Sequence, residues 1–142
     1  MPNTDPVNWQ PIGQMPLIAS MIDGALDDTS KHLQTLTEAR TQPHVLDDAT
    51  IDRVEQVHNE QMDFIDIYTQ QISRWRAEKP SPSQTRELDR MAAQNRQLRA
   101  VTAELLSLAA ELRKGTIERV MDMTDLELGL QALLGTQPSG RR

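Results

Sequence analysis

The sequence contains no cysteine and few aromatic side chains. Without cysteine the chain cannot form disulfides, thiolate metal sites or a cysteine nucleophile. Aromatic residues make up only 3% of the 142 residues, although such side chains normally supply much of the buried area of a core. Lean cores are often completed by a second copy of the chain, so we expect a homodimer, with another protein as a further possible partner.

Long apolar runs and catalytic signatures are missing as well. No stretch approaches the roughly 18 apolar residues of a membrane span, and residues 1–14 lack the order of a secretory signal. We therefore expect a cytoplasmic protein without a membrane partner. The sequence contains no glycine-rich phosphate loop, no Gly-x-Ser-x-Gly elbow and no His-Glu-x-x-His. It predicts no catalytic residue and no cofactor.

What the sequence does contain is a heptad repeat from Leu88 to Leu112. Its two recurring positions are occupied by Leu88, Asn95, Thr102 and Ala109, and by Met91, Leu98, Leu105 and Leu112. A second repeat places Ile51, His58, Ile65 and Ile72 at one position and Val54, Gln61, Tyr68 and Trp75 at the other. Each repeat predicts a helix with a narrow apolar seam that needs a partner helix.

Short connections define the predicted topology. Asp47 is expected to cap the second helix, which should run to about Lys79, and Ser81 with Gln84 forms a capping box for the third. Because the turn at 80–83 is short, these two helices should form an antiparallel hairpin. Val57, Phe64 and Ile67 widen the apolar face of the second helix, so that it can touch more than one neighbour.

The remaining segments complete an all-α helical bundle. We predict an extended proline-rich arm at 1–16, a single helical domain at 17–135 and a flexible tail at 136–142. A first helix should span 17–39. Gly115 is expected to end the third helix, leaving a short C-terminal unit with helices at 116–121 and 125–134. The last of these helices is either a cap on the bundle or a recognition helix for another protein.

Several side chains are candidates for assembly. Trp9 on the proline-rich arm is expected to dock on the bundle or on a neighbouring subunit, with a disordered tail as the alternative. Asn95 interrupts an apolar seam, and such residues either fix helix register or line a pocket for a small ligand. In an antiparallel hairpin Asn95 should lie near Tyr68, and Gln61 near Thr102. The residues predicted to carry assembly are Trp9, Ile65, Tyr68, Ile72, Trp75, Asn95, Leu98, Leu105 and Leu130.

Two alternative functions have weaker support. Glu55 and His58 form a Glu-x-x-His pair, as in di-metal helical bundles, but the third helix supplies no second histidine. His32 comes near only if the first helix packs there. Residues 74–99 contain seven basic and three acidic residues, a net charge of +4 on a chain of net charge −6. This basic zone suggests nucleic-acid binding or self-pairing, against a simple solvated face; its arginines are Arg74, Arg76, Arg86, Arg90, Arg96 and Arg99.

The acidic residues Glu60, Asp63 and Asp66 fit a solvated helix face better than a catalytic pair. The function that the sequence predicts is a non-catalytic helical interaction, scaffold or regulatory module that assembles through its heptad seams. A small-ligand or metal-binding bundle around Glu55 and His58 is the alternative. Nucleic-acid binding through the basic zone ranks below it.

Overall fold

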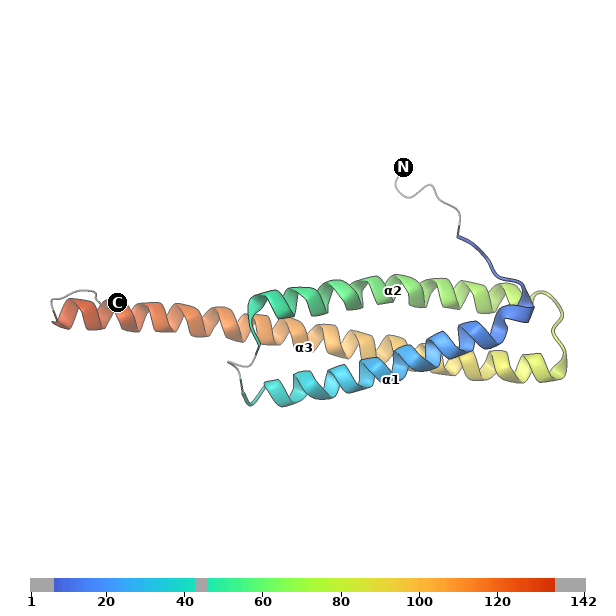
Figure 1. Ribbon diagram of the computed structural model, residues 1–142, viewed down its shortest axis with the longest axis horizontal. Coiled ribbons are helices and arrows are strands. Elements are labelled where there is room, and N and C mark those ends of the chain that lie inside the picture. The colour runs from blue at the N-terminus through green and yellow to red at the C-terminus, as the bar shows by residue number, and fades with distance from the viewer. Residues whose placement is uncertain (1–6, 43–45, 135–142) are drawn as a thin grey trace.

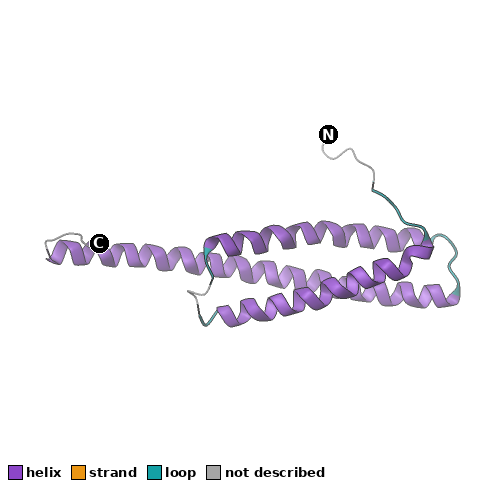
Figure 2. Ribbon diagram, viewed as in Figure 1, coloured by secondary structure: helices purple, strands orange, loops and turns teal. Residues whose placement is uncertain are grey.

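The chain folds into three α-helices with no strand in the part that the structure describes. The computed structural model describes residues 7–42 and 46–134, and side chains within this part as far as Gly115. The elements are a 3-10 turn, η1 (Ile12–Gln14), and the helices α1 (Met15–Ala39), α2 (Asp48–Arg76) and α3 (Pro82–Leu134). Figure 2 shows this all-helical composition. The predicted all-α class is therefore confirmed.

The helices form an elongated bundle in which α3 is the common neighbour. α1 and α2 each pack closely along α3, whereas their own backbones approach each other less closely. α2 and α3 run antiparallel as the predicted hairpin, and α1 runs in the same direction as α3 (Figure 1). The side of α1 and α2 that faces away from α3 is therefore not covered by a helix of the described chain.

Both predicted seams pack inside this one chain, with most of their residues buried and Val54, Gln61 and Leu112 partly buried. Leu98, Leu105 and Ile65 are fully shielded from solvent, and Trp75 is 0% exposed. α1 supplies the third side of the core, with Met15, Ile22, Thr29 and Leu36 recurring every seven residues and all buried. The lean core is thus completed by α1, and the seams do not depend on a second copy for their burial.

The helix starts follow the capping chemistry of the sequence. Thr50 donates its backbone N–H to Asp47 Oδ1 at 2.9 Å. Ser81 and Gln84 bond reciprocally, Gln84 N–H to Ser81 Oγ at 3.1 Å and Ser81 N–H to Gln84 Oε1 at 2.9 Å. These contacts satisfy amides that the first helical turn leaves free.

Three predicted boundaries require correction. α1 begins at Met15, because Pro16 is tolerated in a first turn, where its missing N–H is not needed. α2 ends at Arg76 rather than near Lys79, which instead adopts a left-handed conformation with φ 55° in the turn. Gly115 does not end α3, which continues to Leu134 as one helix in place of a separate C-terminal unit. The predicted tail at 136–142 and residues 1–6 of the arm lie outside the described residues.

The core consists of two apolar clusters separated by a polar middle. The cluster near the hairpin turn includes Met15, Ile18, Ala19, Ile22, Tyr68, Ile72, Trp75, Leu88 and Met91. The cluster at the other end includes Leu36, Ile51, Leu105, Leu108 and Ala109. Between them lie the buried polar residues Thr29, His58, Asn95 and Thr102.

Truncating the α3 seam tests its contribution to stability. Leu98→Ala and Leu105→Ala each remove a fully buried side chain and leave a cavity between packed helices. We expect each substitution to lower the free energy of unfolding by about 2–5 kcal/mol, measured by urea denaturation. An exposed position such as Gln97→Ala serves as the control. Unchanged unfolding of both leucine variants would contradict the seam assignment.

Candidate functional site

The face of α1 and α2 opposite α3 carries an unusual number of exposed apolar side chains. Leu17 is 52%, Met21 44%, Val57 48% and Phe64 54% exposed, and Val7 of the arm is 40% exposed. All five line two adjoining pockets between α1, α2 and the arm. A contiguous apolar face of this kind commonly marks an interaction site, whereas singly scattered apolar residues do not. We call this surface the α1–α2 groove.

The two pockets form a continuous depression along α2. The pocket nearer the arm has a volume of about 340 Å³ and the other about 240 Å³, and both are lined by Phe64 and Tyr68. The lining residues of α2 run from Val57 to Gln71, four helical turns or about 21 Å. The walls are mostly apolar, so the groove suits a bound hydrophobic ridge rather than a charged small molecule.

The N-terminal arm forms one end of the groove. Gln10 accepts a hydrogen bond from Trp75 Nε1 at 2.9 Å through its carbonyl, and its own N–H donates to Gln71 Oε1 at 2.7 Å. The guanidinium of Arg74 lies 4.1 Å from the centre of the Trp9 ring, a cation–π arrangement. The described part of the arm is therefore fixed on α2 of its own chain, and Trp9 docks on the bundle rather than on a neighbouring subunit.

A polar layer connects all three helices beneath the groove. Gln61 donates through Nε2 to Thr29 Oγ1 and to Thr102 Oγ1, both at 2.8 Å. Thr102 in turn donates to the carbonyl of Leu98 at 2.7 Å. The predicted proximity of Gln61 and Thr102 is confirmed. Thr29 was not among the predicted core residues, although its seven-residue spacing from Ile22 and Leu36 is the signal that places it in the core.

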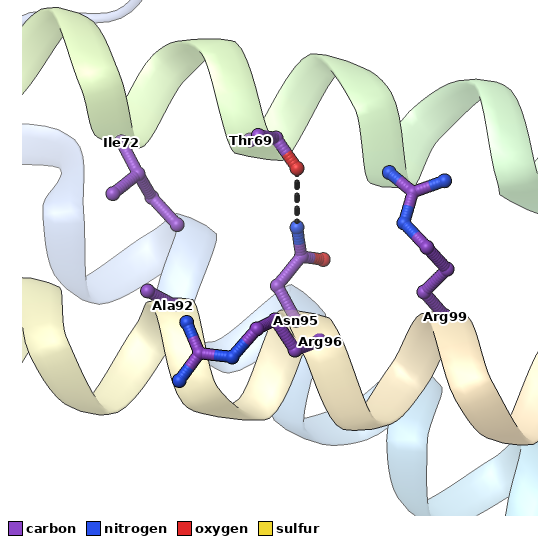
Figure 3. A pocket seen from close by; sticks show the side chains of 6 residues that line it. All are labelled: Thr69, Ile72, Ala92, Asn95, Arg96 and Arg99. Atoms are coloured by element: carbon purple, nitrogen blue, oxygen red, sulfur yellow. Dashed lines mark hydrogen bonds between the residues drawn. The ribbon is translucent and has the colours of Figure 1, made fainter.

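Asn95 forms hydrogen bonds with α2, one of them to Thr69, the residue next to the predicted neighbour Tyr68. Its Nδ2 donates to the carbonyl of Ile65 at 3.1 Å and to Thr69 Oγ1 at 3.0 Å. Its carbonyl oxygen is buried and has no hydrogen-bond partner within the described chain. Figure 3 shows Asn95 in a pocket of about 220 Å³ lined by Thr69, Ile72, Ala92, Asn95, Arg96 and Arg99. Because this oxygen is shielded from solvent, the geometry favours a register-fixing role over contact with a small ligand.

Within the described residues, His32 and His58 are not part of a metal-ligand cluster. His32 and His58 meet edge to face with ring centroids 5.7 Å apart. His58 Nδ1 bonds the Val54 carbonyl at 2.8 Å, which leaves its Nε2 as the only ring nitrogen that could ligate a metal, and Glu55 is paired with Arg113 at 2.6 Å. No group of three or more potential ligands comes together anywhere in the described part of the chain. The Glu-x-x-His spacing is therefore used for packing and ion pairing.

Three of the seven basic residues of the basic zone form ion pairs with acids of neighbouring helices. Arg76 pairs with Asp89 at 2.8 Å, and Arg99 with Asp66 at 2.6 Å. Arg90 holds Asp23 of α1 at 3.0 Å and also bonds Glu87. The hydrogen bond from Arg90 lowers the pKa of the Asp23 carboxyl. The other four basic residues of the zone, Arg74, Lys79, Arg86 and Arg96, have no ion pair among the described residues, and Arg74 stacks on Trp9. Ion pairing within the bundle therefore leaves only part of the zone available to a phosphate backbone.

Comparisons with known proteins give no relative from which to infer a function. No family model, no curated protein and no solved structure matches this chain. Within the residues that the structure describes, no helix is both long enough and apolar enough to cross a membrane. The function therefore has to be inferred from the surfaces of the molecule itself.

Replacing Asn95 tests whether this amide costs stability. In Asn95→Leu the unpartnered buried oxygen is removed, and Thr69 Oγ1 still donates to the Ile65 carbonyl at 2.9 Å. We expect the free energy of unfolding to rise by about 1–2 kcal/mol in urea denaturation. Asn95→Asp, which buries a carboxylate at the same site, is expected to lower it. A loss of stability in Asn95→Leu would show that the amide is net stabilising.

Protonation of His58 provides a pH test of the polar middle. Burial lowers the pKa of His58 below its ordinary value in the folded chain, and the neighbouring His32 lowers it further. The unfolded chain therefore takes up a proton first as the pH falls below about 6.5, and stability should decrease from there until the folded pKa is passed.

The measurement is the urea midpoint between about pH 7.5 and about pH 5.5, where most carboxylates stay ionised. His58→Gln should flatten the pH dependence, whereas His32→Gln should retain most of it. Equal slopes in the wild type and His58→Gln would contradict the assignment.

Proposed function

We propose that this chain is a non-catalytic interaction module that binds an amphipathic helix of a protein partner in the α1–α2 groove. The observation that carries this proposal is that, up to Gly115, where the structure describes side chains, every strongly exposed large apolar side chain borders this one groove. Exposing Leu17, Met21, Val57 and Phe64 together is unfavourable unless a partner covers them.

The helix arrangement supports a helical partner. α1 and α2 flank the groove as neighbouring helices flank the vacant position of a four-helix bundle. A helix in that position would pack its ridge between α1 and α2, with apolar residues at i, i+3 or i+4, and i+7. The groove length of about 21 Å corresponds to about 14 helical residues.

The sequence predicted assembly through the heptad seams. Because those seams are buried within the chain, we place the proposed interaction surface in the groove instead. Ile65, Leu98 and Leu105 are already covered by the chain's own helices. Assembly with a partner through these residues would require the bundle to open, at the cost of the core. The groove offers apolar area that is available in the folded chain.

A photo-crosslinker placed in the groove tests this proposal. Phe64 is replaced by p-benzoylphenylalanine, which extends the same ring, and the matched control carries this residue at exposed Gln97 of α3. Irradiation in cells that naturally contain the chain should give an adduct from position 64 and none from position 97. Mass spectrometry should map the adduct to a segment with helical apolar spacing. Adducts of equal yield at both positions, or no adduct at 64, would overturn the proposal.

Phe64→Glu separates binding from folding. Because Phe64 is 54% exposed, this substitution should change the free energy of unfolding by about 0.5 kcal/mol or less while abolishing partner binding. A large loss of stability would instead assign Phe64 to the core.

A further inference from the structure

We propose that the helix bound in the α1–α2 groove is the C-terminal part of α3, residues 116–134, of a second copy of this chain. Two copies would exchange these segments reciprocally to form a homodimer. This inference rests on the proposed function of the groove and names its occupant.

The first observation is the length of α3. Figure 1 shows that α3 continues past the ends of α1 and α2, and Arg113 still pairs with Asp52 and Glu55 near the start of α2. Beyond Gly115 the helix continues to Leu134, so about 19 residues or 28 Å of helix lie outside the bundle. Most of the stability of a helix in a protein comes from packing against other elements, and no helix of the described chain lies beside this stretch, which calls for a partner.

The second observation is that the heptad of α3 continues in the sequence beyond Gly115. The two seam positions that hold Leu105 and Ala109 recur as Thr116 and Arg119, and then as Met123, Leu126, Leu130 and Leu133. The repeat that is buried within the bundle between Leu88 and Ala109 is therefore followed by two further apolar heptads in the same register. Such a continuation predicts a second helix-packing surface along the same helix.

The third observation is that, in the proposed dimer, residues 116–134 of one copy would lie at the same level along the bundle axis as the groove residues of the other. Contacts of Asn95 with Thr69, of Thr102 with Gln61 and of Arg113 with Asp52 set the register of α3 against α2. With a two-fold axis at Gly115, residue 130 of the second copy would lie level with residue 100 of the first. In this register that level corresponds to Phe64 of α2, so positions 123 and 133 would fall near Val57 and Ile67, both groove-lining residues.

The direction of the exchanged helix also suits a bundle. A segment related by this axis would run antiparallel to α1 and α3 and parallel to α2. The result is a four-helix arrangement with two helices in each direction, repeated identically in both copies. Each chain would cover its own groove and its own projecting helix in a single closed assembly.

Charge gives the dimer a distinctive salt dependence. The sequence of 116–134 contains four acidic residues and one basic residue, and Asp28, Glu60 and Asp63 are exposed acids of α1 and α2 without an ion-pair partner in the described chain. Like charges oppose association at low ionic strength, so screening should strengthen the dimer. An interface built on opposite charges would weaken instead.

Sedimentation equilibrium of the full chain tests the inference. The wild type should be a dimer at about 100 μM, and its dissociation constant should fall several-fold between about 0.05 M and about 0.5 M NaCl. Phe64→Glu and Leu130→Glu should each be monomeric, with circular dichroism like that of the wild type. Gln131→Glu, next to a seam position, should remain dimeric.

Mixing the two variants makes the test specific to reciprocal exchange. The Phe64→Glu chain keeps an intact 116–134 segment, and the Leu130→Glu chain keeps an intact groove. Their equimolar mixture should therefore form a one-to-one heterodimer, weaker than the wild-type dimer. A monomeric wild type, a dimeric Phe64→Glu variant or a mixture that does not associate would overturn the inference.

The crosslinking experiment distinguishes failure of the proposed exchange of residues 116–134 from failure of the proposed function of the groove. An adduct of position 64 with residues 116–134 of a second copy supports both. An adduct with a helix of another protein keeps the groove function and overturns the exchange. Absence of any adduct at position 64 overturns both.

Discussion

The bonds from Gln61 to Thr29 and Thr102 are the interaction on which the arrangement of the bundle depends. They are the point at which one side chain contacts the other two helices through specific hydrogen bonds. Apolar seams alone tolerate sliding by a turn, because each turn presents a similar ridge to its neighbour. A slip of about 5.4 Å would break both bonds of the Gln61 amide, although Thr102 would keep its bond to the Leu98 carbonyl within α3. The layer therefore sets the axial position of α1 and, with it, the location of the groove.

Helix identity and hairpin register were predictable because they depend on local spacing and capping. The seven-residue recurrence of Ile51 to Ile72 and of Leu88 to Ala109 identifies the buried faces, and the reciprocal Ser81–Gln84 bonds follow from residue types three apart. The Gly115 prediction was wrong for a quantitative reason. Glycine costs a helix about 1 kcal/mol, which is too little to end a helix when helix-forming sequence continues on both sides.

The groove could not be predicted from the sequence, since it depends on where α1 packs. Val57 and Phe64 were interpreted as a second apolar face that touches another neighbour, and the pattern gives no indication whether that neighbour belongs to the same chain. In the structure α1 packs mainly on α3, so these two side chains remain about half exposed. The same packing explains why Thr29 was missed, because its burial becomes apparent only once α1 is recognised as a third heptad helix.

The apolar seams are buried in the core and the apolar groove is exposed, and this difference limits the surfaces through which the chain can associate. An interface through Leu98 or Ile65 would exchange one buried contact for another and gain little net apolar burial. An interface through Phe64, Met21 and Val57 removes apolar area that is in water in the isolated bundle, so the full gain from burial favours association. The polar layer strengthens this distinction, because opening the bundle would also break the bonds of Gln61. Stability therefore resides in the seams, whereas the proposed recognition uses the groove, and a substitution in one should leave the other largely intact.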